Sequence, residues 1–268
     1  MSTHKYSHIL IRLVAAMTPF ILFGIIYDSM RYYPNYLFNT IDTENVYNLE
    51  KSWFGISTAA GVMTPNEYFN INNCALGDLL SGIFYLLWVP LPIIYGIYLF
   101  FSGQKELCIK FTTAFLFVNL IGFAGYYIYP ASPPWYVLQY GFEPVLNTPG
   151  NVAGFERFDD LLGMNIFHSI YGKNANVFAA IPSLHSAYNP IALFYALKAR
   201  KSLGWISVLT IVSVGIWWAA VYSCHHYIID VMLGVLCTII GIAIIELIIY
   251  RIPSISSFYK KWAEWLNK

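Results

Sequence analysis

The sequence predicts an all-α, polytopic membrane protein, a six-helix bundle with short interfacial helices in its outer loops. Of its 268 residues, 58% are hydrophobic and 18% aromatic, while only 11% are charged. A soluble domain carries about 25% charged residues, so a cytosolic protein of this composition would precipitate. The apolar residues gather in runs about as long as the roughly 20 residues that cross a bilayer. We therefore expect a single integral membrane domain over residues 1–268.

Six apolar runs are the predicted spans: residues 9–27, 79–101, 111–129, 182–199, 203–222 and 231–250. Pro90 and Pro92 predict a kink in the second span, since membrane helices tolerate proline with a local bend. Pro182 is expected at the first position of the fourth helix, where its missing N–H costs nothing.

Two long polar segments, residues 30–73 and 130–176, lie after the first and third spans. In the first, YNLEKSWF at residues 47–54 predicts an interfacial helix, because its aromatic side chains suit headgroup depth. The second opens with PASPPWY at residues 130–136, which is too rich in proline for a regular element. Loops of this length often carry function, and the motif-bearing core is expected over about residues 79–250.

The basic residues predict the orientation of the chain. Four lie in the long loops (Arg31, Lys51, Arg157 and Lys173), and the other eleven lie at the termini or in the short turns: Lys5, Arg12, Lys105, Lys110, Lys198, Arg200, Lys201, Arg251, Lys260, Lys261 and Lys268. Short cytoplasmic segments are enriched in Lys and Arg. We therefore expect both termini in the cytoplasm and the active site on the extracytoplasmic (periplasmic or lumenal) side.

Several functions and features are not expected from this sequence. A net charge of +1 without a basic tract argues against nucleic-acid binding. The four cysteines show neither a metal-ligand spacing nor a disulfide framework, and a Cys74–Cys224 bridge, which the topology would permit, is not expected. Pro19 lies within the first apolar run and no small-residue cleavage site follows it, so no signal peptide is expected. No cofactor is expected either.

Two polar islands, IPSLHS at residues 181–186 and SCHHYIID at residues 223–230, interrupt the apolar runs on the outer side. Hydrocarbon solvates titratable groups poorly, so their presence needs a reason. His226 and Asp230 are four apart and would share a face of one helix. Asp230 would then accept the Nδ1 proton, leaving Nε2 of His226 as a nucleophile. His185, at the same depth, would protonate the leaving alkoxide and then act as a base.

Other residues have weaker assignments. Ser183 and the amides that open the fourth helix are candidates for binding phosphoryl oxygens. His225 could pack beside His226 or tune it, and His168 is expected to be an ordinary loop residue. The charges of the second long loop could contact a polar headgroup or be solvated: Arg157, Asp159, Asp160 and Lys173.

Two simpler readings of the islands stay open. A single histidine within a membrane is often only a donor in helix packing. A metal site of His185, His226 and Asp230 is also possible, because histidine and carboxylate suit zinc. The acid–base scheme itself requires no metal.

PSLH at residues 182–185 and the spacing from His226 to Asp230 resemble two signature motifs of the type 2 phosphatidic acid phosphatase superfamily. PASPPWY and the doubled His225-His226 look like its inositol phosphorylceramide synthase-like branch. The resemblance implies a six-helix membrane fold in which His226 is the nucleophile, Asp230 orients it and His185 is the acid and base. It also implies substrate binding by His225 and by Pro134, Trp135 and Tyr136.

The chain departs from the phosphatase pattern at two places. The lysine followed by Arg-Pro has no counterpart near residues 130–135, and the expected Ser-Arg reads Ala219-Ala220. Those cations hold a phosphomonoester dianion, whereas a phosphodiester carries less charge. The resemblance thus implies a phosphotransferase that moves a headgroup, such as the inositol phosphate of phosphatidylinositol, to a ceramide-like lipid through a phosphohistidine.

Two alternatives remain. A lipid phosphatase of the same superfamily would use water in place of the acceptor lipid. A transporter or binding module is a different class, and the few charged residues within the last three spans disfavour it.

Overall fold

The computed structural model describes residues 2–172, 176–200 and 203–268, so Lys173 and Lys201 lie outside the described residues. The regular elements are almost all helical: α1 (Ser2–Ser29), η1 (Met30–Tyr32), η2 (Asn35–Leu37), α2 (Asn45–Phe54), β1 (Ile56–Thr58), β2 (Gly61–Met63), α3 (Pro65–Ile71), α4 (Ala75–Leu86), α5 (Pro90–Phe101), α6 (Lys105–Ile128), α7 (Pro134–Tyr140), η3 (Ala153–Phe155), α8 (Glu156–Leu162), α9 (Ile166–Tyr171), α10 (His185–Lys198), α11 (Leu203–Tyr222), α12 (Ile228–Leu247), η4 (Ile249–Arg251) and α13 (Pro253–Asn267).

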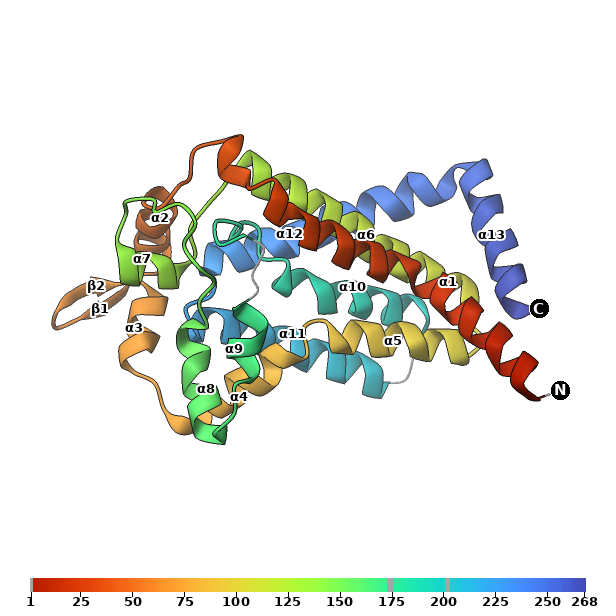
Figure 1. Cartoon of the computed structure of the whole chain (residues 1–268), viewed down its shortest axis with the longest axis horizontal. Coiled ribbons are helices and arrows are strands. Elements are labelled where there is room, and N and C mark those ends of the chain that lie inside the picture. The colour runs from red at the N-terminus through yellow and green to blue at the C-terminus, as the bar shows by residue number, and fades with distance from the viewer. Residues whose placement is uncertain (1, 173–175, 201–202) are drawn as a thin grey trace.

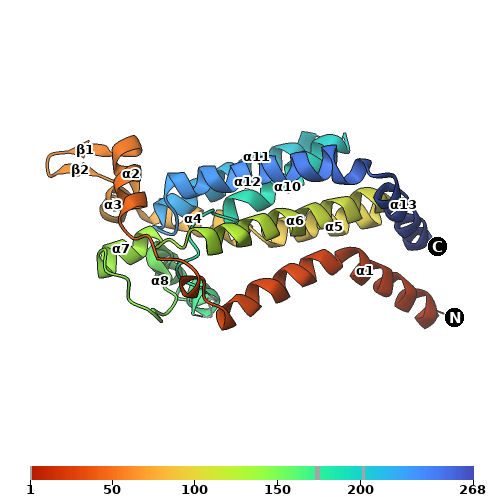
Figure 2. The same cartoon turned by 90° about the horizontal axis from the view of Figure 1, so that it is seen from above.

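The axes of the long helices are roughly parallel, and these helices form one bundle (Figures 1 and 2). Within it, α10 packs against α11 and α12, α1 against α6, and α4 against α11. Both chain ends lie at one end of the bundle. The short helices α2, α3 and α7 and the antiparallel hairpin β1–β2 lie at the opposite end, which we name the loop end.

Four described helices are long and apolar enough to cross a membrane: Tyr6–Tyr32, Lys105–Ile128, Leu203–Tyr222 and Ile228–Arg251. The consecutive helices α4 and α5 make a fifth if taken as one span, bent by 42° just before Pro90. The kink predicted at the prolines is therefore confirmed. The helix expected as the fourth span, α10, has 14 residues. Its length of about 21 Å falls short of a hydrocarbon core of roughly 30 Å.

Two expectations about helix starts are wrong. The fourth helix was expected to begin at Pro182, but α10 begins at His185, and the Ser183 amide before it donates 2.9 Å to the Asp230 carbonyl. PASPPWY was expected to be irregular, but α7 begins at Pro134. Proline suits the first helical position, and the extended backbone of Pro133 is the conformation that a residue before proline prefers.

Aromatic side chains fill the space between α1, α6 and α10. The ring of Phe115 lies 4.4 Å from that of Phe20 and 4.6 Å from that of Tyr188, measured between centroids. Such rings bury large apolar areas and favour tilted contacts. The Tyr188 hydroxyl donates 2.8 Å to Asn119 Oδ1, which satisfies a polar pair inside this core.

Gly234 lets α12 approach the start of α10 closely. A Cβ atom at residue 234 would lie 1.9 Å from the Ser183 carbonyl oxygen and 2.2 Å from Ser186 Oγ. Ser186 Oγ itself donates to the Ser183 and Val231 carbonyls. Small residues at helix crossings allow this kind of backbone approach, and here it brings the first turn of α12 beside His185.

Two buried side chains from the loop end fix the turn between α11 and α12. Glu50 of α2 accepts hydrogen bonds from the amides of Ile228 (2.9 Å) and Ile229 (3.1 Å), the first two residues of α12. Asn66 of α3 donates 2.9 Å to the Val221 and His226 carbonyls. The polar loops thus determine where the SCHHYIID segment lies.

Candidate active site

His185, His226 and Asp230 meet where α10 and α12 begin. His185 Nδ1 lies 3.1 Å from His226 Nε2, and His226 Nδ1 lies 3.4 Å from Asp230 Oδ2. The two islands, separated by 41 residues between the histidines, therefore form one cluster. His226 is in contact with a second histidine on one side of its ring and with a carboxylate on the other.

The contact between His226 and Asp230 arises differently from the expected one. The two residues do not share a helix, because His226 precedes α12 and Tyr227 is its N-cap. Asp230 Oδ2 accepts the Tyr227 amide at 2.9 Å and so turns the carboxylate back toward the imidazole. The Ala220 carbonyl accepts the amides of both His225 and His226 at 3.0 Å, which fixes the backbone of the doubled histidines.

This geometry favours one tautomer of His226. A proton on Nδ1 faces the Asp230 carboxylate, which leaves the Nε2 lone pair to accept a hydrogen bond from His185 Nδ1. The 3.4 Å separation is longer than a normal hydrogen bond, and such contacts tighten as charge develops. Burial lowers the pKa of His226 to about 4, against the smaller opposing effect of a backbone hydrogen bond with Ala180. The imidazole is therefore neutral at pH 7, as a nucleophile must be.

A cavity of about 270 Å³, named here the histidine cavity, opens onto the pair. His185, His225 and His226 line it together with aromatic side chains that include Trp88, Tyr126 and Tyr188. The Trp88 ring meets the His185 ring edge-on at 4.6 Å. No lysine or arginine is among the described residues that line this cavity. Its walls therefore suit an apolar molecule that brings a single negative charge to the histidines.

His225 lies in the same cavity but is held differently. Its Nε2 lies 2.9 Å from the Val152 carbonyl oxygen, so that nitrogen carries the proton. Its ring lies 4.9 Å from the ring of Phe155 and 4.4 Å from that of Tyr171. Burial lowers the pKa of His225 to about 3. His225 is thus a neutral donor engaged with the backbone and forms part of the wall.

The proline-rich segment contributes only in part. The strand-like contacts of Ala131 with Asp42 and Ala179 hold the segment in place, and its Trp135 lines the histidine cavity. Pro134 and Tyr136 are not among the lining residues. Tyr136 is fully buried, and its hydroxyl donates 2.8 Å to the Glu143 carbonyl and accepts the Val145 amide at 2.6 Å. Its role in this structure is to fold the loop that follows α7.

Ser183 does not line the histidine cavity. Its amide is used by the Asp230 carbonyl, and its fully buried hydroxyl has no hydrogen-bond partner among the described residues. Ser183 thus joins the start of α10 to α12. The structure brings His185, His226 and Asp230 together, whereas Ser183 lies outside the cavity.

The loop charges divide into two kinds. Asp159 accepts the amides of Ile166, Phe167 and His168 and contacts His168 Nδ1 at 2.9 Å, so it caps α9. Burial alone would raise the pKa of Asp159, but these hydrogen bonds lower it below its ordinary value. Asp160 is exposed, while Arg157 lines a second pocket described below. Across the described residues, no group of three or more His, Cys, Asp or Glu is arranged to hold a metal ion.

Sequence reasoning missed most of the cavity wall. Tyr188 lies three residues after His185 on α10, so helical spacing could have placed it on the same face. Trp88 lies in the break between α4 and α5 and Tyr126 on α6, and no local pattern relates them to the islands. Glu50 also leaves no such signal, because it reaches α12 across 178 residues of chain.

Comparison with known proteins places the chain in a family. A family model described as "PAP2 superfamily" matches residues 66–244. The chain is 51% identical, over 96% of its own length and 84% of the other, to the phosphoinositol dihydroceramide synthase of Bacteroides thetaiotaomicron. It is 28% identical to the inositol phosphorylceramide synthase of Candida albicans over 63% of this chain and 37% of that one. It is 35% identical to the catalytic subunit AUR1 of the Saccharomyces cerevisiae inositol phosphorylceramide synthase, over 44% of this chain and 29% of that one. The match therefore spans only about a third of these fungal relatives. No solved structure matches significantly.

Proposed function

Because this chain belongs to the PAP2 superfamily, we propose that its histidine pair moves a phospho-headgroup from one membrane lipid to another. The protein is a lipid phosphotransferase of that superfamily, related over nearly its whole length to a phosphoinositol dihydroceramide synthase. Following the names of its relatives, the donor is a phosphatidylinositol-like lipid and the acceptor a ceramide-like lipid. The observation that carries the mechanism is the 3.1 Å contact between His185 Nδ1 and His226 Nε2 at the cavity wall.

In the first step, the Nε2 lone pair of His226 attacks the phosphorus of the donor, and the bond from phosphorus to the diacylglycerol oxygen breaks. His185 takes up a proton as the anionic donor phosphate binds beside it, because the negative charge stabilises the imidazolium. It then gives this proton to that oxygen, so diacylglycerol leaves as a neutral alcohol. The headgroup phosphate stays on His226, whose imidazolium charge faces Asp230. The contact between the histidines must open for this attack, because the same lone pair accepts the hydrogen bond in the resting protein.

In the second step, neutral His185 takes the proton of the acceptor hydroxyl, and the acceptor oxygen attacks the phosphorus. The bond from phosphorus to His226 breaks, and the imidazole regains its lone pair. His185 then holds a proton and His226 is neutral, as they were with the donor lipid bound. Two displacements at phosphorus, with lower barriers, thus replace one direct transfer of the headgroup between two lipids.

The surroundings of the pair favour a phosphodiester over a phosphomonoester. Ala219 and Ala220 are fully buried, and their carbonyls accept the amides of Ser223, His225 and His226. They stand where the phosphatase pattern has Ser-Arg, and no lysine or arginine is among the described residues of the cavity wall. A dianion would find no counter-charge there, whereas a monoanionic diester needs less.

The histidine cavity is assigned to the extracytoplasmic side. Both termini and the short basic turns belong to one end of the bundle, and the polar loops belong to the other (Figure 1). Basic residues mark the cytoplasmic end. The headgroup transfer would then take place in the leaflet facing away from the cytoplasm.

The direct test replaces the nucleophile. Vesicles containing His226→Ala protein should show at least a thousandfold loss of headgroup transfer from labelled phosphatidylinositol to ceramide, because His225 is engaged with the Val152 carbonyl and His185 serves as the acid and base. Labelled donor without acceptor should leave an acid-labile, alkali-stable label on the wild type and none on the variant. Thin-layer separation of lipids and of the denatured protein measures both.

The matched control is His8→Ala, which removes an exposed histidine of α1 at the opposite end of the molecule and should keep wild-type transfer. Transfer by His226→Ala above a trace would refute the nucleophile. Release of inorganic phosphate from a lipid phosphomonoester, without need for a second lipid, would identify a phosphatase instead.

A further inference from the structure

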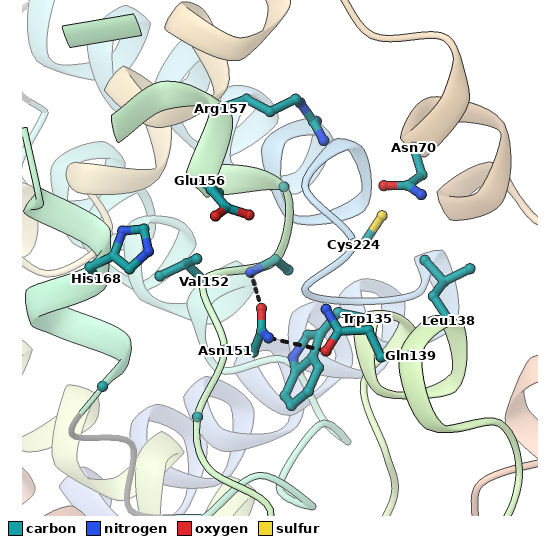
Figure 3. Close-up of a pocket in the computed structure, with 14 residues that line it drawn as sticks. Asn70, Trp135, Leu138, Gln139, Asn151, Val152, Glu156, Arg157, His168 and Cys224 are labelled. Carbon is teal, nitrogen blue, oxygen red and sulfur yellow. Dashed lines mark hydrogen bonds between the residues drawn. The ribbon is translucent and has the colours of Figure 1, made fainter. Parts of the chain in front are cut away.

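A second cavity, of about 450 Å³, lies beside the histidine cavity at the loop end, and we name it the loop pocket. Its walls come from α7, residues 150–157, α9 and the turn after α11. Figure 3 shows Asn151 in the middle, with Glu156 and His168 on one side of it and Trp135 and Gln139 on the other. None of these polar side chains takes part in the transfer chemistry described above.

The lining has the hydrogen-bonding character that hydroxyl groups require. Asn70, Gln139 and Asn151 are carboxamides, which both donate and accept, and the Glu156 carboxylate accepts. Asn151 Nδ2 donates 3.1 Å to Gln139 Oε1, and its Oδ1 accepts the Ala153 amide at 2.6 Å, so two of these amides are held in place before any ligand binds. A ring of hydroxyls, each both donor and acceptor, matches such a set better than a simple anion or cation does.

Arg157 brings an anchored donor to the same pocket. Its Nε donates 2.6 Å to Asp78 Oδ1, and its guanidinium lies 5.3 Å from the centre of the Tyr222 ring. Its Nη2 is buried and has no hydrogen-bond partner among the described residues. An unpaired buried donor of this kind is costly, and a ligand oxygen in the pocket would satisfy it.

The loop pocket adjoins the reacting atoms. Trp135 lines both cavities, and the Val152 carbonyl, whose residue lines the loop pocket, binds His225 of the histidine cavity. On α9, Tyr171 faces the histidine cavity while the next residue, Gly172, lines the loop pocket. A phosphate at His226 could therefore direct its headgroup past Trp135 into this space.

We propose that the loop pocket binds the polyhydroxylated ring of the donor lipid's headgroup and so selects donors that carry a neutral polyol. This inference rests on the proposed transfer function and assigns its headgroup subsite. Glu156 accepts hydrogen bonds from the ring hydroxyls, and Gln139 both donates and accepts them. Trp135 covers one face of the ring, and Arg157 supplies the buried donor. Recognition of the headgroup is thus separate from the chemistry at phosphorus.

The test uses the full-length protein in vesicles with phosphatidylinositol and ceramide. Glu156→Leu and Gln139→Leu should each raise the KM for phosphatidylinositol at least tenfold and leave kcat within about twofold, because they weaken donor binding without touching the histidines. Free myo-inositol should bind the wild type in saturation-transfer NMR and bind both variants more weakly. Asp160→Leu is the matched control, since Asp160 is an exposed carboxylate of the same helix outside the pocket.

The possible results separate the two proposals. Wild-type KM values and wild-type myo-inositol binding in both variants would overturn the polyol subsite while leaving headgroup transfer intact. Absence of any transfer from phosphatidylinositol by the wild type would overturn the proposed function, and the NMR measurement would still decide whether the pocket binds a polyol. Equal effects of Asp160→Leu and Glu156→Leu would also count against the subsite.

Discussion

At the scale of single residues, Glu50 shows how the site depends on a side chain far from its chemistry. The carboxylate is fully buried and accepts the first two amides of α12, the helix that carries Asp230. Carboxylates at a helix N-terminus satisfy free amides and oppose the helix dipole. Burial nevertheless dominates and raises the pKa of Glu50 to about 7, although those amides favour the charged form.

Glu50 therefore predicts a pH dependence of stability. Because its pKa is higher in the folded than in the unfolded protein, its stabilising contribution is complete below about pH 4.5 and is lost as the pH rises through about 7. Glu50→Gln is neutral at every pH and should lack this loss. The unfolding temperature of the detergent-solubilised variant, relative to wild type, should thus increase from pH 5 to pH 8. Glu44→Gln, an exposed neighbour, should follow the wild type, and parallel profiles for Glu50→Gln would contradict the prediction.

Single residues also mark what could be read from the sequence. His185, His226 and Asp230 stand out because titratable groups at the ends of apolar runs are rare and need partners. Their nearness could be predicted, but its route could not, since Asp230 reaches His226 through the Tyr227 N-cap and not along one helix. Glu50 could not be found, because its contact with α12 is purely tertiary.

At the scale of elements, the approach of α12 to α10 sets the geometry of the site. Gly234 lies against the Ser183 carbonyl, and this contact allows the first turn of α12 to reach the level of His185. Adding atoms to such a crossing displaces backbone, which costs about 1–3 kcal/mol. The 3.1 Å contact between the histidines depends on the same crossing.

Gly234→Ala should therefore lower both stability and activity. A Cβ 1.9 Å from the Ser183 oxygen must push the helices apart, so we expect a lower unfolding temperature and at least tenfold slower headgroup transfer. The control is Gly24→Ala in α1, where no atom lies within 4 Å of the new Cβ. Activity of Gly234→Ala equal to that of Gly24→Ala would show that the crossing does not position the histidines.

The elements themselves were predictable where apolar runs are long. The span expected at residues 203–222 coincides with α11 (Leu203–Tyr222), and the expected helix at residues 47–54 lies within α2. The helix α7 was not expected and the start of α10 was misplaced, because Pro134 and Pro182 give the same local signal. Proline permits a helix to begin but does not require it, and residues 182–184 precede α10 without joining it.

At the scale of the whole molecule, a polar loop end lies opposite the end that holds both termini, and this division is the basis of the proposed membrane orientation (Figure 2). The hairpin turn at residues 59–60 belongs to the loop end. Basic turns at the other end should stay in the cytoplasm. The expected count of six spans is not reached among the described helices, because α10, with 14 residues, is too short to cross a membrane.

Reporter fusions test the orientation. In a bacterial host, a green fluorescent protein after Lys268 should fluoresce, because it folds in the cytoplasm, and alkaline phosphatase at that position should stay inactive. Alkaline phosphatase inserted between Ala59 and Ala60 should be active, because it reaches the periplasm. Exchange of these two patterns would reverse the assigned side of the active site.

The aromatic wall of the histidine cavity has a consequence for fidelity. A phosphohistidine can lose its phosphoryl group to any hydroxyl, and water is by far the most abundant one. Trp88, Tyr126 and Tyr188 line the cavity beside His185 and His226, and their apolar surface favours contact with a lipid alcohol over water. In the proposed mechanism, the apolar wall therefore decides the partition between synthesis and wasteful hydrolysis, while the two histidines serve either outcome equally.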